Sequence, residues 1–286
     1  VQSQPDRLDA DDIWGLMEKD RATFLLIVGD AFARPLLDGL STSKRDLSSL
    51  LSILSGGAPL SAHLKVEFHQ YLPSVILVDG LGSSEAGGQL SQVASGDSST
   101  TGSFPLAPQN HILSEDLTSE LQAGHEGLGW LAKSGRLALG YLNDEAKTKK
   151  TYPIVGGIRY VVPGDRARLT ADMFIEVHGR DSVTINSGGE KIFAEEVEAA
   201  VKAHPDVYDC VVTGRPSERW GNEVVAVVRL KAGAATTEAS LLEVAQNYIA
   251  RFKLPKQFVF VETIVRSPAG KADYRWAKQI AIEAAN

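Results

Sequence analysis

The sequence predicts a protein of α/β plus α+β class, in which α/β layers come first and a compact α+β unit comes last. Three observations support this fold class. Helical and extended patterns alternate from Ile13 to about Ser103, which is typical of α/β layers. Short strands punctuated by Gly and Pro then run from about Phe104 to His178, and two amphipathic helices accompany three apolar strands after Asp181. The 286 residues are enough for two or three modules.

In the first region, the expected helices and strands follow one another closely. They are a helix at 10–20, an extended run at 24–28, a helix at 33–40, a strand at 50–54, a helix at 61–71 and an extended segment at 74–78. The turn from Ser55 to Leu60 joins the strand to the next helix, and Pro59 suits a helix start. We assign residues 1–103 to the remaining part of a large-domain α/β subdomain.

The other two regions are defined by β-strands and by helix faces. Strands expected at 129–132, 158–162, 167–169 and 174–178 favour a small β-barrel or sheet over residues 104–180, of which we assign the barrel. Residues 181–286 are expected to form a mobile C-terminal α+β domain with strands at 207–213, 224–230 and 257–262. One helix has on one face Val197, Ala200, Val201 and His204, and another has at helical spacing Leu241, Ala245, Tyr248, Ile249 and Phe252.

Composition narrows the classes of protein to which the chain belongs. Its net charge of −7 argues against general nucleic-acid binding, and its apolar runs are shorter than the roughly 20 residues of a membrane helix. The first residues lack the pattern of a signal peptide, and the missing initiator Met suggests a piece of a longer chain. The sole cysteine, Cys210, can form no internal disulfide, so we expect a cytoplasmic protein.

Two segments carry the most specific signals. The span from Gly179 to Ile192 combines a charged start, a β-branched run and a glycine pair, and Ser267 to Lys271 reads Ser-Pro-Ala-Gly-Lys. Both resemble motifs of the acyl-CoA synthetase, or AMP-dependent adenylate-forming ligase, superfamily. Residues 154–165 look most like actinobacterial fatty-acid or steroid side-chain ligases. The resemblance implies the C-terminal half of an acid-thiol ligase that uses ATP, Mg²⁺ and coenzyme A.

The segment Gly80 to Glu85 follows a predicted strand and combines glycines, hydroxyls and a carboxylate. Glycines allow close approach to a ligand, and Mg²⁺ prefers oxygen ligands. The family usually has Tyr-Gly-x-Thr-Glu here, so Leu81 and Ser84 depart from it. The resemblance implies that Gly82 and Ser84 bind nucleotide and that Glu85 is catalytic and holds the metal. Without the other motifs, the segment would be an ordinary polar turn.

Two further segments resemble nucleotide-binding motifs. Gly57, Ala58 and Pro59 belong to a Gly-Gly-Ala-Pro-Leu loop, which in the family lines the adenine and acyl pockets. Asp165 stands where the family has the aspartate of Thr-Gly-Asp, whose carboxylate accepts hydrogen bonds from the ribose. Arg180 is implied to reach the ribose or phosphates. Taken alone, each segment is also compatible with a plain surface turn.

The same resemblance assigns roles to the last third of the chain. Lys271 matches the catalytic lysine, whose ammonium group offsets the repulsion between the attacking carboxylate and the α-phosphate. Ser182 occupies the hinge position, where the family usually has Asp or Lys. The residues that the resemblance places at the coenzyme A site are Gly188, Gly189, Trp220, Phe252 and Lys253.

Several alternatives stay open. An enzyme of this family that loads a carrier protein has the same motifs, Gly82 to Ala86 nearly matches the G-x-S-x-G elbow of a serine hydrolase using Ser84, and a non-catalytic binding remnant is a third class. The Lys-containing phosphate loop of the family is missing, so we expect the chain alone to be inactive. The expected partners are a fatty acid or other carboxylic acid, ATP and coenzyme A, with homodimer formation and peripheral membrane contact both open.

Overall fold

Three β-sheets of three or more strands organise the chain in the computed structural model, which describes residues 8–94, 100–267 and 269–285. The first sheet has four strands in the order β1-β2-β3-β4, with the first three parallel and β4 antiparallel. Its strands are β1 (Phe24–Ile27), β2 (Ser52–Gly56), β3 (Ile76–Ser83) and β4 (Gly87–Val93). The order confirms the α/β layers expected for this region.

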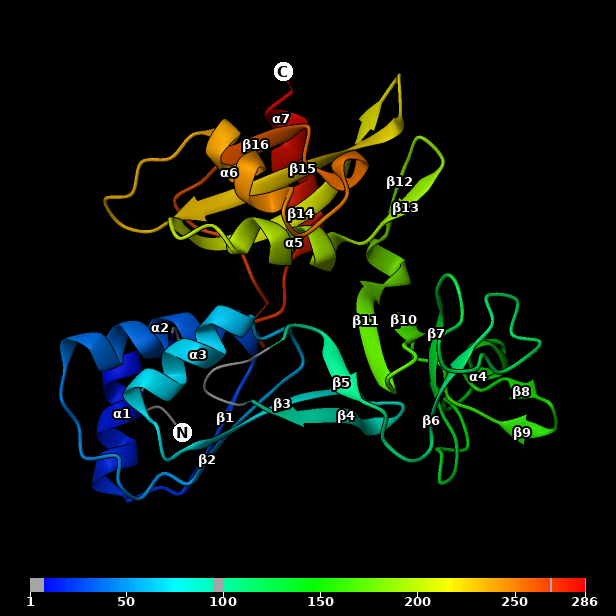
Figure 1. The fold of residues 1–286 in the computed structure, drawn as a ribbon, viewed down its shortest axis with the longest axis horizontal. Helices are drawn as coiled ribbons and strands as arrows, with labels where there is room; N and C mark the ends of the chain where they lie inside the picture. The colour runs from blue at the N-terminus through cyan, green and yellow to red at the C-terminus, as the bar shows by residue number, and fades with distance from the viewer. Residues whose placement is uncertain (1–7, 95–99, 268, 286) are drawn as a thin grey trace.

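Helices α1 (Ala10–Lys19), α2 (Gly29–Thr42) and α3 (Ala62–Tyr71) pack on one face of this sheet (Figure 1). The carboxylate of Asp9 caps α1 by accepting a hydrogen bond from Asp12 N. Trp14 is fully buried, and its indole N–H donates to Leu36 O at 2.8 Å. Ile53 and Phe68 complete the contact between strands and helices. Burial of these side chains fixes the helices against the sheet.

The second sheet is open, so of the two forms expected for residues 104–180 the sheet is confirmed and the β-barrel is wrong. Its order is β5-β11-β10-β7-β6, and its edge strands β5 and β6 do not pair with each other. Its strands are β5 (Ser103–Pro105), β6 (Asn110–Leu113), β7 (Gly129–Lys133), β10 (Asp165–Leu169) and β11 (Phe174–Arg180). Strand β5 is only three residues long and ends at Pro105, which lacks a backbone donor for a further ladder. Between β7 and β10 lie α4 (Glu145–Thr151), β8 (Ile154–Val155) and β9 (Ile158–Arg159).

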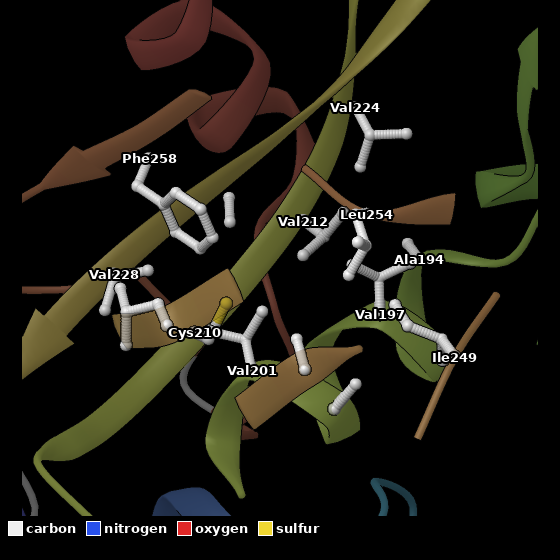
Figure 2. Close-up of a cluster of buried hydrophobic side chains, with 14 of the residues drawn as sticks. Ala194, Val197, Val201, Cys210, Val212, Val224, Val228, Ile249, Leu254 and Phe258 are labelled. Atoms are coloured by element: carbon white, nitrogen blue, oxygen red, sulfur yellow. The ribbon is translucent and has the colours of Figure 1, made fainter. Parts of the chain in front are cut away.

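The third sheet has helices on both faces. Its order is β14-β15-β16, with β14 and β15 antiparallel and β15 and β16 parallel. The elements are β14 (Val207–Ser217), β15 (Gly221–Leu230), β16 (Gln257–Phe260), α5 (Ala194–Lys202), α6 (Glu238–Ala245) and α7 (Tyr274–Glu283). Figure 2 shows the core on the α5 and α6 side, where Val197 and Val201 meet Cys210 and Val212. The alternate residues Val211 and Val227 face Ala277 of α7 on the other side.

The helix expected around Leu241 to Phe252 is shorter than its apolar spacing indicates. Helix α6 ends at Ala245, and a separate 3₁₀ turn covers Arg251–Lys253. Tyr248 and Phe252 are exposed, because the chain leaves the helix before either could reach the core. His204 is buried as expected but lies beyond α5, where it bonds Ser240. Within the residues that the structure describes, no helix is long and apolar enough to cross a membrane.

Candidate nucleotide and acyl-transfer site

The loop after β2 is held by the connection between β1 and α2. Gly29 N donates to Ser55 Oγ at 3.1 Å, and Asp30 N donates to Pro59 O at 3.1 Å. A Cβ on Gly29 would lie 2.5 Å from Pro59 O, and Gly29 has a φ of +53°, so only glycine fits here. The Gly57, Ala58 and Pro59 loop is therefore fixed in place by a residue that the sequence motifs did not single out.

Glu85 lies at the tip of the hairpin between β3 and β4. Gly82 lets the two strands approach, because a Cβ there would lie 2.4 Å from Gly87 O. Tyr141 Oη donates to Glu85 Oε1 at 2.5 Å, and this hydrogen bond lowers the pKa of Glu85 below its usual value. The carboxylate is therefore ionised at neutral pH. No motif in the sequence singled out Tyr141, and nothing in its spacing indicated a contact 56 positions away.

The elbow of a serine hydrolase requires a strand, a tight turn and then a helix. Ser84 instead lies in a turn between two antiparallel strands, β3 and β4. Two histidines are engaged elsewhere: His111 bonds Glu120 and Ser134, and His125 accepts from Leu169 N. The local structure around Ser84 is therefore wrong for a nucleophile elbow.

Asp165 and Arg180 meet where β10 and β11 pair. They are register partners, and Arg180 Nε lies 3.3 Å from Asp165 Oδ1. Burial raises the pKa of Asp165, and the Arg180 guanidinium opposes that shift. The charge of Glu85 also acts on Asp165, so the two carboxylates and Arg180 belong to one electrostatic neighbourhood. The guanidinium remains about half exposed and free to meet an anion.

Lys271 reaches this region from the C-terminal part of the chain. Its Cε lies 3.9 Å from the position a Cβ would take on Gly57. The preceding Gly270 packs against α2, since a Cβ there would lie 2.6 Å from the Phe32 ring. Figure 1 shows the chain between β16 and α7 descending to α2. The structure thus brings Lys271 to the loop of residues 57–59, although the two are far apart in sequence.

The segment that carries Lys271, which we call the Lys271 loop, is closed by hydrogen bonds between Ser267 and Lys271. Ser267 N donates to Lys271 O at 2.8 Å, and Lys271 N donates to Ser267 Oγ at 3.2 Å. Arg266 makes two hydrogen bonds to Asp209 of β14, at 2.7 Å and 2.9 Å, and donates to Gly270 O at 3.2 Å. Bidentate pairs of this kind define geometry as well as charge. The loop is therefore attached to the third sheet.

The expected hinge and the glycine pair lie between the second and third sheets. Ser182 is exposed in a 3₁₀ turn, Asp181–Val183, that leads from β11 into the hairpin of β12 (Ile185–Ser187) and β13 (Glu190–Ile192). Gly188 N donates to Trp220 O at 2.8 Å, and a Cβ on Gly188 would lie 3.0 Å from the Trp220 ring. Gly188 and Trp220 are therefore neighbours, with Gly189 beside them in the same turn.

Phe252 and Lys253 form a separate exposed edge. Lys253 Nζ lies 5.9 Å from the centre of the Phe252 ring and bonds both carboxylate oxygens of Glu196, at 2.6 Å and 2.7 Å. Its ammonium group is thus committed to Glu196 in this arrangement. None of the hydrogen bonds in the described part of the chain joins this edge, or the Gly188 turn, to Asp165 or Lys271.

A metal site made by the protein alone is absent from residues 8–94, 100–267 and 269–285, because no group of three or more His, Cys, Asp or Glu side chains is placed to hold an ion. Glu85 is a single ionised carboxylate. That donor set fits Mg²⁺, which usually takes one or two carboxylates and fills its remaining positions with phosphate oxygens and water.

Comparisons with known proteins show which family the chain resembles. The family model described as AMP-binding enzyme matches residues 1–142, and the one described as AMP-binding enzyme C-terminal domain matches residues 196–271. A medium-chain acyl-CoA ligase, Mig, of Mycobacterium avium is 51% identical over 97% of this chain and 50% of its own length. A medium/long-chain-fatty-acid and 3-oxocholest-4-en-26-oate CoA ligase of Mycolicibacterium smegmatis is 44% identical over 96% of this chain and 51% of its own length.

The fold is also similar to that of solved structures. The crystal structure of ATP-bound MatB from Rhodopseudomonas palustris matches with a TM-score of 0.80 and 25% identity, covering 98% of this chain and 55% of that chain. The chain spans about half the length of the curated relatives it matches. The two matched family regions and the arrangement of the Gly57, Glu85, Asp165 and Lys271 segments lead to one conclusion: the chain belongs to the AMP-binding, or adenylate-forming, enzyme family.

Proposed function

We propose that this chain is the C-terminal half of a fatty-acid or related carboxylic-acid CoA ligase. The observation that carries the proposal is the approach of Lys271 to the Gly57 loop, together with the ionised Glu85 and the Asp165–Arg180 pair. A lysine ammonium at this place can offset the repulsion between a carboxylate and a phosphate as they react. The names of the relatives that are 51% and 44% identical support acyl-CoA formation from medium- or long-chain acids.

Each side chain then has a defined role in the first step, in which acid and ATP give acyl-adenylate and pyrophosphate. Glu85 would hold Mg²⁺, which when bound would neutralise phosphate charge. Asp165 accepts hydrogen bonds from the ribose, and Arg180 contacts the ribose or phosphates. Gly57, Ala58, Pro59, Gly82 and Ser84 line the nucleotide and acyl pocket. Lys271 stabilises the charge that develops at the α-phosphate.

The second step, transfer of the acyl group to coenzyme A, requires a different arrangement of the third sheet. Lys253 is paired with Glu196, and the Gly188 turn rests on Trp220, away from the Lys271 loop. Rotation at Ser182 would withdraw Lys271 and bring the Gly188–Gly189 turn, Trp220, Phe252 and Lys253 toward the adenylate. Because Cys210 is buried and is the only cysteine, a reducing cytoplasm suits the protein.

Fatty-acid-dependent exchange of pyrophosphate into ATP tests the proposal. The measurement compares the 286-residue chain with a hybrid in which the N-terminal half of the Mycobacterium avium relative precedes it. We expect exchange and acyl-CoA formation by the hybrid, and only weak AMP binding without turnover by the chain alone. A folded hybrid that binds ATP but catalyses neither step with any medium- or long-chain acid would contradict the proposal. Loading of a carrier protein in place of coenzyme A would favour the alternative within the same family.

A further inference from the structure

A buried ion pair joins the first and third sheets of the molecule. Lys202, the last residue of α5, donates to Asp30 in the first turn of α2 at 2.6 Å. Only 10% of the Lys202 side chain and 8% of the Asp30 side chain are exposed. Exposed ion pairs contribute little, but leaving one charge of a buried pair without its partner is strongly unfavourable. Each side chain therefore depends on the other for as long as both are buried.

Asp30 is held ready for this contact by its own part of the chain. Ser61 donates twice to its carboxylate, from N at 2.7 Å and from Oγ at 2.6 Å. Burial alone would raise the pKa of Asp30, but Lys202 and these hydrogen bonds outweigh burial and lower it. The neighbouring His63 adds no positive charge near neutral pH, because burial lowers its pKa to about 4. Lys202 is thus the cation that neutralises Asp30.

The pair lies beside the contact that places Lys271. Asp30 stands between Val28 and Phe32, and a Cβ on Gly270 would lie 3.6 Å from Val28 and 2.6 Å from Phe32. The start of α2 is therefore held at two points, by Lys202 and by the Lys271 loop. Figure 1 shows α5 and the descending Lys271 loop on the same side of α2.

Lys202 and Asp30 each have a second partner nearby that remains when the contact between them opens. Glu198 lies one helical turn before Lys202 on α5, and its charge already acts on that ammonium group. Asp30 keeps the two hydrogen bonds from Ser61. Separation is therefore possible without leaving either group isolated, as a reversible contact requires.

We propose that Lys202 and Asp30 are positioning residues that hold the third sheet in the arrangement delivering Lys271 to the Gly57 loop. Resting on the proposed function, the pair favours adenylate formation over transfer to coenzyme A. It touches neither substrate nor the reacting atoms. Its effect is on the ratio of the two domain arrangements.

The distance between the two parts can be measured in the 286-residue chain without any activity. Spin labels on Lys44→Cys and Gln246→Cys report it, both positions being exposed, whereas the native Cys210 is buried and unreactive. We call molecules closed when the third sheet lies against α2, as in this structure, and open when the two have separated. We expect Lys202→Met and Asp30→Asn each to lower the ratio of closed to open molecules by about tenfold or more. Tyr208→Phe is the matched control, because it removes a solvent-accessible hydrogen bond to Asp38 across the same interface. Its effect should be several-fold smaller.

An unchanged distance distribution in Lys202→Met and Asp30→Asn would overturn the proposal, as would equal opening by Tyr208→Phe. Loss of cooperative unfolding in both variants would also overturn it, because the pair would then support the fold rather than the arrangement. In the hybrid enzyme, Lys202→Met should lower pyrophosphate exchange about tenfold and leave coenzyme A transfer from supplied acyl-adenylate undiminished. Opening of the labelled chain together with an inactive parent hybrid would support the positioning role and count against the proposed function alone.

Discussion

The first and third sheets differ in how many of their faces are covered. Helices α5 and α6 cover one face of the β14–β16 sheet and α7 covers the other, so its strand residues are buried on both sides. Among the residues that the structure describes, the helices packed on the β1–β4 sheet, α1 to α3, all lie on one face. On its other face, apolar side chains are exposed by 52% at Phe24, 61% at Leu26, 54% at Ile76 and 66% at Val93.

These exposed residues lie on one surface because their strands are in register. Phe24 pairs with Ser52 and Ser52 with Ile76, so their side chains point to the same side. Parallel sheets are normally covered on both faces, and contiguous exposed apolar patches usually mark contact surfaces. The helices of this chain thus cover both faces of the third sheet, whereas the first sheet has one apolar face exposed. The Gly57 loop lies beside the first sheet, and Lys271 reaches it from the part of the chain that holds the third sheet.

The largest expected effect is a difference in the free energy of unfolding between a substitution in the covered core of the third sheet and one on the exposed face of the first. Leu241→Ala removes a fully buried side chain between α6 and the sheet and should lower the free energy of unfolding by about 2–5 kcal/mol. Leu26→Ala should change it by less than about 0.5 kcal/mol. Denaturant unfolding of both variants measures the difference. Equal losses in the two variants would show that the two sheet faces do not differ in burial.

A smaller effect is expected on self-association. Placing a charge on the exposed face, as in Leu26→Lys or Ile76→Lys, should weaken association between chains by about tenfold, since it interrupts an apolar contact surface. Leu139→Lys is the control, because Leu139 is 95% exposed but lies outside the sheet. Sedimentation velocity over a range of concentrations gives the association constants. If Leu139→Lys has the same effect, the sheet face is not the contact surface.

The smallest effect concerns Glu195, at the start of α5, beside the segment that links the second and third sheets. Its Oε1 accepts from Arg180 N at 3.4 Å, and its Oε2 is buried without a hydrogen-bond partner among the described residues. Burial, and then the charge of Glu198, raises the pKa of Glu195 from 4.5 to about 7. Between pH 4.5 and about 7, the Glu195 carboxyl is therefore protonated in the folded chain and ionised in the unfolded chain.

Stability contributed by neutral Glu195 is present below pH 4.5 and is lost as the pH rises through about 7. Glu195→Gln should remove this loss and stabilise the chain above neutral pH by on the order of 1 kcal/mol, since solvent screens the partly buried group. Thermal unfolding of both proteins near pH 5 and near pH 8 measures it. Parallel pH profiles would show that Glu195 does not titrate there.

Local motifs predicted the turns of the site but not the contacts between distant segments. Gly57 and Gly188 were identified because a tight turn requires particular residues at particular spacings. The Tyr141–Glu85 bond and the Lys202–Asp30 pair span 56 and 172 positions, and no short pattern specifies such contacts. Apolar spacing at Tyr248 and Phe252 predicted a longer helix, because spacing alone does not reveal where the chain turns away from the core. The assigned roles of the site residues and the three-part division of the chain stay predictions.

We infer that the part of the chain built on the third sheet delivers Lys271 to the Gly57 loop beside the first sheet. The most direct test measures the two half-reactions of the hybrid enzyme with Lys271→Ala. Adenylate formation, measured as pyrophosphate exchange, should fall by about 10²- to 10³-fold, as expected for the loss of one group that stabilises transition-state charge. Transfer to coenzyme A from supplied acyl-adenylate should be nearly unchanged. Equal losses in both half-reactions would contradict the account and assign Lys271 a structural role.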